Sequence, residues 1–152
     1  MPQKFLMARK PFRYLSHTAD VEFVAYGKNL KEAVENAALA LLNVALDIKK
    51  ITDSRAPRRS ITISEKADSI ENLVWFVLQD INSKRASGYL NAYGFKVDKI
   101  SRTKNGLGLK GRLLHKKISG DHTVLDVKAV TPHDLMVTTG KGRCSIRVTL
   151  DV

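Results

Sequence analysis

Two aspartates at opposite ends of the sequence have the types and positions that could do chemistry. Asp20 lies between two apolar runs of strand character, residues 12–15 and 21–26, and Asp151 follows a third such run beside Val152. Three anionic oxygens held close together repel one another unless a cation joins them. Oxygen ligands without His or Cys favour Ca²⁺, Mg²⁺ or Mn²⁺ over zinc. We therefore predict a divalent-cation site formed by Asp20, Asp151 and the terminal carboxylate of Val152.

Simpler roles for these residues stay open on residue types alone. Asp20 could cap a turn, and Asp151 could be a solvated chain end. His17 lies three residues before Asp20, where it orients that carboxylate, serves as an acid–base group or is a satisfied packing residue. Lys128 and His133 either face the same site or are ordinary polar groups at strand ends.

The elements that must position these residues begin with two long helices. Asn29, with Glu32 three residues later, predicts the N-terminus of a helix that runs to about Leu46. Ser69 or Asp68 is expected to cap the second helix, whose residues 73–78 are all apolar. Residues 47–60 read as a loop followed by a strand at 61–63. After residue 92 we expect a meander of strands at 93–100, 107–114, 124–130 and 143–150, with a short one at 134–137.

Both helices carry apolar residues nearly all round, which is typical of helices covered on more than one side. One sheet with two helices on its outer face would leave their backs exposed to water. The sequence therefore predicts an α+β fold with three layers, β-α-β, in which two helices lie between mixed or antiparallel sheets.

Composition limits the functional class. The 152 residues fit one domain, expected over 11–152 after a basic, flexible lead-in at 1–10. The 26 Lys and Arg against 15 acids give a net charge of +11, which favours encounters with polyanions such as RNA. The single Cys144 indicates a reducing compartment. No apolar run reaches the roughly 20 residues of a membrane span, so we expect a cytoplasmic protein without a membrane partner.

The chain resembles the archease family in several blocks that occur in the family's order. These blocks are His17-Thr18-Ala19-Asp20-Val21, Ala25-Tyr26-Gly27, Glu32 to Ala38, Glu71-Asn72-Leu73-Val74-Trp75, Val127 to His133, and the ending at Asp151.

This resemblance implies a protein cofactor and not an enzyme. Archeases assist the GTP-dependent RNA ligase that seals tRNA halves in tRNA splicing, promoting its guanylylation and multiple turnover. The resemblance implies a bound divalent ion, calcium by preference, at Asp20, Asp151 and Val152, and an activating role for Lys128. Asp47 matches an acidic family position more weakly. Where the family usually has an aromatic residue, this chain has Pro132, which puts the role of His133 in doubt.

Two other functions remain as alternatives. The net charge is compatible with a stand-alone RNA-binding module. A cation held by carboxylates could also activate water in a metal-dependent phosphoesterase acting on RNA. We prefer the activator because the acidic pair has no use on an RNA-facing patch, and because no nucleophile with its own base is evident in the sequence.

Overall fold

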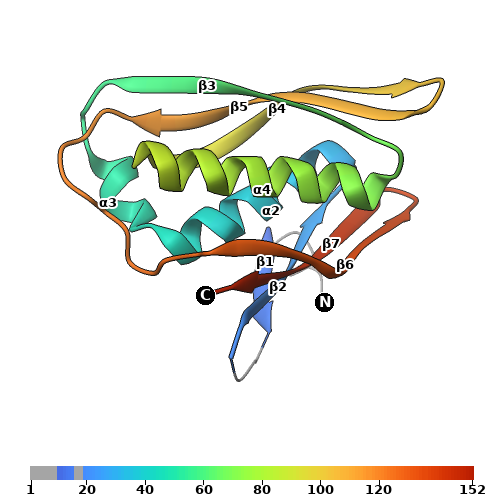
Figure 1. Cartoon of the computed structure of the whole chain (residues 1–152), viewed down its shortest axis with the longest axis horizontal. Coiled ribbons are helices and arrows are strands. Elements are labelled where there is room, and N and C mark those ends of the chain that lie inside the picture. Colours follow the sequence, from blue (N-terminus) through green and yellow to red (C-terminus); the bar gives the residue numbers. More distant parts are fainter. Residues whose placement is uncertain (1–9, 16–18) are drawn as a thin grey trace.

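Two antiparallel sheets enclose the long helices in the computed structural model, which describes residues 10–15 and 19–152 (Figure 1). The four-stranded sheet has the order β1-β2-β7-β6, with β1 at Phe12–Leu15, β2 at Val21–Gly27, β7 at Arg143–Asp151 and β6 at Ala129–Gly140. The three-stranded sheet has the order β3-β5-β4, with β3 at Arg58–Ala67, β5 at Gly106–Lys116 and β4 at Asn91–Thr103. The predicted α+β fold with three layers is confirmed, and within the described residues all neighbouring strands of the two sheets are antiparallel.

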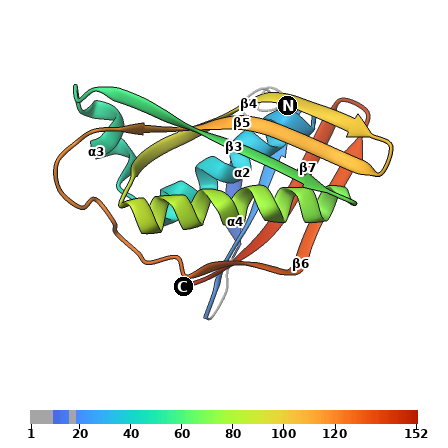
Figure 2. The ribbon, with the colours of Figure 1, turned by 45° about the horizontal axis from the view of Figure 1, so that its top comes forward.

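The middle layer consists of α2 (Leu30–Ala45) and α4 (Ile70–Gly88), and the short helix α3 (Ile48–Asp53) lies at one end. Figure 2 shows the strands of the β3-β5-β4 sheet crossing over both long helices at an angle. Helix α2 contacts β2 and β4, and α4 contacts β6 and β3, so each helix touches both sheets. This double coverage explains why both helices are apolar nearly all round. Among the described residues, no helix has the length and apolar character that crossing a bilayer requires.

The N-terminus of α2 has the cap that the sequence predicts. The Asn29 side chain accepts a hydrogen bond from the Glu32 N–H at 2.9 Å, and the Glu32 carboxylate accepts one from the Lys28 N–H at 2.9 Å. The carboxylate thus reaches the residue before the cap, a small departure from the usual capping box.

Replacing Asn29 with Ala should lower the free energy of unfolding by about 1 kcal/mol, because the Glu32 N–H loses its acceptor. A lower urea midpoint with an unchanged slope would report this loss. Lys31→Ala, in the same exposed turn, is the control and should change stability by less than about 0.5 kcal/mol. Equal midpoints for the two variants would show that the cap contributes nothing.

Four local predictions differ from the structure. Within the predicted loop 47–60, α3 forms after Asp47. β3 starts at Arg58 and extends well beyond the predicted 61–63. Residues 124–128 are outside any strand: Leu46 bridges to Thr123, and the Val124 N–H donates to the Ala45 carbonyl. β6 instead begins at Ala129 and continues as far as Gly140, so the predicted short strand 134–137 is part of a longer one.

The C-terminus of α4 carries a non-glycine residue in a left-handed conformation. Tyr89 has φ 50° and ψ 42°, and the next N–H, that of Leu90, donates to the Arg85 carbonyl at 3.0 Å. Helices usually place glycine at this position because a side chain there costs about 1–2 kcal/mol. Gly88 is the immediately preceding residue, so the chain places its glycine one position too early to relieve this strain.

Candidate functional site

The pairing of β2 with β7 brings the two predicted carboxylates to the same end of one sheet. Val21 is opposite Leu150, and this is the last pair of the ladder. Asp20 directly precedes Val21, and Asp151 directly follows Leu150. Continuing the antiparallel register by one residue would therefore place Asp20 opposite Asp151. The two central strands of the sheet thus draw together residues from the two ends of the chain.

Asp20 is half-buried beside a hollow of about 400 Å³ between the β1-β2 hairpin and the end of α2. Tyr14 and Asn43 line this hollow, together with Leu125 from the segment before β6. The Tyr14 hydroxyl donates to the Ala40 carbonyl at 2.9 Å and accepts from the Asn43 amide at 3.1 Å, and burial raises the pKa of Tyr14. These bonds tie β1 to α2 and fix one wall beside Asp20.

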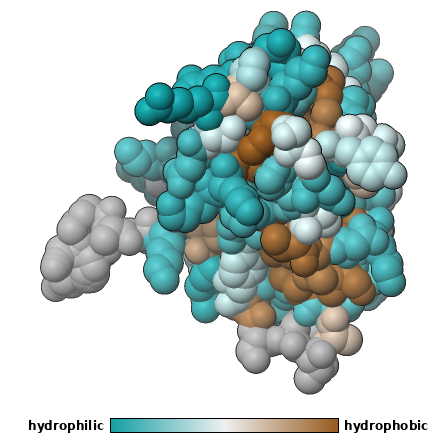
Figure 3. All heavy atoms as spheres, turned by 90° about the vertical axis from the view of Figure 1, so that its left-hand side faces the viewer, coloured by the Kyte–Doolittle hydropathy of each residue, from teal (hydrophilic) through white to brown (hydrophobic). Residues whose placement is uncertain are grey.

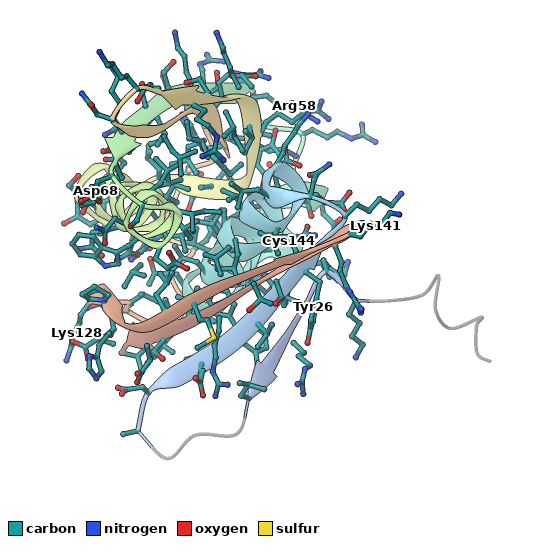
Figure 4. All side chains as sticks on the ribbon, turned by 90° about the vertical axis from the view of Figure 1, so that its right-hand side faces the viewer. Tyr26, Arg58, Asp68, Lys128, Lys141 and Cys144 are labelled. Carbon is teal, nitrogen blue, oxygen red and sulfur yellow. The ribbon has the colours of Figure 1, made fainter. Side chains whose placement is uncertain are left out.

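The backbone of Lys128 lies next to that of Asp151 in space. Its backbone N–H donates to the Asp151 carbonyl at 2.8 Å, and the following residue, Ala129, is opposite Asp151 in the β6-β7 pairing. The Lys128 side chain is exposed, and Figure 4 shows it at the opposite end of the sheet from Tyr26 and Lys141. Val152 is half-buried and packs against the core.

Helix α4 positions the segment that carries Lys128. The Trp75 indole N–H donates to the Val130 carbonyl at 2.7 Å, and the Gln79 side chain accepts from the Val130 N–H at 2.8 Å. One turn further on, the Asn82 amide donates to the Val127 carbonyl at 2.9 Å. Both sides of Lys128 are thus held by side chains of one helix, which sequence reasoning missed because these polar residues lie within an otherwise apolar helix.

Arg85 completes this arrangement from the core. Its side chain is only 3% exposed and donates two hydrogen bonds to the Asn82 side-chain oxygen, at 3.1 and 2.8 Å. Burial lowers the pKa of Arg85, although the carboxylates of Asp126 and Asp121 oppose this shift. A buried guanidinium needs such acceptors, so the Arg85-Asn82 pair stabilises the fold only while both partners are present.

A third carboxylate, Glu22, lies two residues after Asp20 on β2. It is 7% exposed and accepts a hydrogen bond from Arg147 Nε at 2.6 Å. The carboxylate raises the pKa of Arg147 through this bond and through its charge. Arg147 thus offsets the charge of Glu22 close to the predicted site.

Among the described residues, the weaker candidates Asp47 and His133 make their polar contacts away from Asp20. Asp47 caps α3, where its side chain accepts from the Lys50 N–H at 3.2 Å. The His133 side chain is 84% exposed and lies 3.8 Å from the Asp134 carboxylate. His17 falls outside the described residues.

Pro132 lies in an irregular stretch of β6, where the pairing register with β7 shifts between Thr131 and Met136. β6 is also an edge strand, so its bulge can accommodate a residue that has no N–H to donate. Asp134 in this stretch has φ 64°. The proline therefore fits the local backbone of β6.

The donor set at this end of the sheet suits a hard divalent cation. In the described ranges 10–15 and 19–152, no group of three or more His, Cys, Asp or Glu side chains could hold a metal ion. A cation here would therefore depend on the two aspartates together with a main-chain oxygen of Val152. Such an all-oxygen set fits the chemistry of Ca²⁺, Mg²⁺ or Mn²⁺.

Apolar side chains surround the same end of the molecule. Figure 3 shows brown, apolar atoms gathered on this face, and Val124 and Leu125 are 62% and 41% exposed. A larger hollow of about 780 Å³ lies elsewhere, at the far end of the β1-β2-β7-β6 sheet, and includes Arg13 and Arg143. The end of the sheet that carries Asp20 is therefore distinguished by its exposed apolar side chains and not by the size of its hollow.

Comparison with known proteins identifies a matching family and several similar proteins. The model of the archease protein family matches residues 12–152. A protein archease of Sulfolobus acidocaldarius is 32% identical over 145 residues, covering 93% of this chain and 98% of that protein. A protein archease of Methanothermobacter thermautotrophicus is 33% identical over 144 residues, covering 94% and 99%.

Two solved structures resemble the fold. The solution structure of a Methanobacterium thermoautotrophicum protein has a TM-score of 0.73 at 30% identity, with coverage of 93% of this chain and 99% of that one. The crystal structure of a Thermotoga maritima protein, described as an archease and possible chaperone, has a TM-score of 0.55 at 22% identity, with coverage of 95% and 97%. The second likeness concerns the fold alone.

Proposed function

The chain belongs to the archease family, and from this membership we propose that it is a protein cofactor of a GTP-dependent RNA ligase in tRNA splicing. In this role it promotes guanylylation of the ligase and lets the ligase turn over repeatedly on tRNA halves. Asp20, Asp151 and Val152 are the proposed acidic site through which it acts.

The observation that carries this proposal is the β2-β7 register, which ends at the Val21-Leu150 pair between the two aspartates. An acidic pair at a strand end has no packing purpose, and two carboxylates brought together cost free energy unless they bind a cation. We propose that the carboxylates of Asp20 and Asp151 and a main-chain oxygen of Val152 hold a divalent ion, Ca²⁺ by expectation. When bound, this ion supplies positive charge that offsets the negative charge of nucleotide phosphates.

The surroundings of Asp20 support contact with a protein partner. Val124 and Leu125 are exposed apolar residues, and Leu125 lines the hollow beside Asp20. Exposed apolar side chains bordered by polar residues are typical of protein-protein contact surfaces. Lys128, held between Val127 and Val130 by the bonds from α4, offers a cation to the same partner.

We propose that catalysis belongs to the ligase. The single cysteine, Cys144, is buried, and burial raises the pKa of its thiol, which disfavours the nucleophilic thiolate. The described arrangement at Asp20 offers charge and contact area to a partner, which is what an activator needs.

The direct test adds the purified protein to the ligase in substoichiometric amounts with radiolabelled GTP and a divalent cation. The rate of guanylylation should rise, and each molecule of activator should serve several ligase molecules. An unchanged rate would refute the proposal. Incubating the protein alone with RNA ends and Mn²⁺ is the control, and steady hydrolysis there would support the metal-dependent phosphoesterase instead.

A further inference from the structure

Tyr89 is a large aromatic side chain that the fold leaves in water. It is 80% exposed and occupies the left-handed position at the end of α4, where glycine is favoured. Nothing in the packing of α4 requires an aromatic ring at this place. A strained residue with an exposed ring suggests a role in binding.

The surroundings of Tyr89 on one side are basic. A hollow of about 440 Å³ beside it includes Arg59, His115 and Lys117, and no acidic residue lines it. The backbone N–H of Lys117 donates to the Pro57 carbonyl at 2.8 Å, and its side chain is exposed, as is that of Arg59. A neighbouring lysine, Lys116, is buried and donates to two carbonyls of the α3 region, so it is occupied within the fold.

The other side of Tyr89 has the opposite charge. A second hollow beside the ring includes Asp121 and Asp126, whose charges act on Arg85. An anionic ligand in contact with Tyr89 is therefore directed towards Arg59 and Lys117. This difference in charge between the two sides of Tyr89 would orient a bound anion, which a uniformly basic surface would not do.

The outward face of the same sheet, opposite to the face that carries Arg59 and His115, is also basic. The register places Lys96 opposite Arg112 and Lys99 opposite Lys110 across β4 and β5, and all four side chains are exposed. Asp98 is paired with Arg112 at 2.9 Å. Figure 4 shows many nitrogen-tipped side chains projecting from this sheet, on the same side of the molecule as Arg58. A chain of phosphates, and not a single anion, matches such an extended surface.

We propose that the Tyr89 hollow is a binding site for single-stranded RNA. A base stacks on the Tyr89 ring, and the adjoining phosphates contact Arg59 and Lys117. Stacking on an exposed aromatic ring requires an unpaired base, which selects single strands over duplexes. This inference rests on the proposed function for the identity of the RNA, which would be the substrate of the ligase. The binding itself can be measured with this protein in the absence of the ligase.

Fluorescence anisotropy with a fluorescein-labelled decauridine tests the stacking contact. Tyr89→Gly should raise the Kd about tenfold, and Tyr89→Phe should retain the affinity, because the ring stacks and the hydroxyl does not. Glycine suits the left-handed backbone, so the Tm of Tyr89→Gly should equal or exceed that of the natural protein. Undiminished binding by Tyr89→Gly would overturn the proposal, and so would equal affinity for a duplex of the same length.

The charge contacts have a matched control. Lys117→Gln should weaken binding and make log K about 0.7 less steep against log salt, as expected for one lost phosphate contact to a single strand. Lys141→Gln removes the same charge on the β6-β7 turn and should leave both quantities nearly unchanged. Equal effects of the two substitutions would overturn the site in favour of diffuse attraction by net charge.

The outcome is separable from that of the ligase assay. Guanylylation of the ligase can be measured without RNA, so Tyr89→Gly should leave that rate unchanged. Suppose that the protein does not activate the ligase, but that Tyr89→Gly binds RNA more weakly while Tyr89→Phe binds it normally. The RNA-binding site is then supported and the proposed function is refuted.

Discussion

Asp20→Asn is expected to abolish ligase activation while leaving the fold intact. The substitution keeps the size of the side chain but removes one of the two carboxylate charges that the β2-β7 pairing brings to one strand end. Affinity for a hard cation depends strongly on the number of charged oxygen ligands, so the Kd for Ca²⁺ should rise by about tenfold or more. The neutral variant relieves repulsion from Asp151, so its Tm without metal should not fall.

Calorimetric titration with Ca²⁺ and the guanylylation assay measure the two effects on the same preparation. Asp53→Asn is the matched control: it removes an equal charge from an exposed carboxylate that pairs with Lys49 on the surface of α3. The control should bind Ca²⁺ and activate the ligase normally. Normal activation by Asp20→Asn would exclude this carboxylate from the mechanism.

Asn82→Leu should lower the free energy of unfolding by about 3 kcal/mol, because it leaves the Arg85 guanidinium buried without its main acceptor. Both residues are only 3% exposed, so water cannot replace the lost bonds without opening the core. The Val127 carbonyl also loses the Asn82 amide at 2.9 Å. The segment that carries Lys128 should therefore open more often than the rest of β6.

Urea unfolding measures the loss of stability, and hydrogen exchange at Lys128 and Ala129 measures the local opening. Asn72→Leu, on the exposed side of the same helix, should change stability by less than about 0.5 kcal/mol. Adding Arg85→Met to Asn82→Leu should recover part of the loss by removing the unpaired charge. If the double variant is no more stable than Asn82→Leu, the cost is one of packing and not of an orphaned guanidinium.

The helices and their burial could be predicted from sequence because the relevant signals are local. Asn29 and Ser69 each cap a helix, because each side-chain oxygen accepts a hydrogen bond from the backbone N–H three residues later. The run at residues 73–78 has no polar face, so a helix there must be covered from two sides. Three layers follow from that requirement before any strand pairing is known.

The errors fell where distant contacts override a local pattern. Residues 124–130 alternate as a strand would, but Val127 is buried without belonging to a ladder, and bonds from α4 hold its carbonyl. The left-handed Tyr89 has no local signal either, since the preceding Gly88 offers a glycine that the turn does not use. The basic hollow at Tyr89 was missed for this reason: its residues come from β3, β5 and the end of α4.

The placement of β7 has a consequence for how the chain is made. Of the seven strands in the two sheets, β7 leaves the ribosome last, yet it inserts between β2 and β6 in the middle of its sheet. Until it arrives, β2 lacks one of its two neighbours, and the face of α2 that β7 covers stays open to water. A nascent chain can therefore complete the β3-β5-β4 sheet first, and it exposes unpaired strand edges until β7 has emerged. Because the β2-β7 pairing is what brings Asp20 and Asp151 to the same strand end, a translation product that stops before β7 lacks the proposed acidic pair.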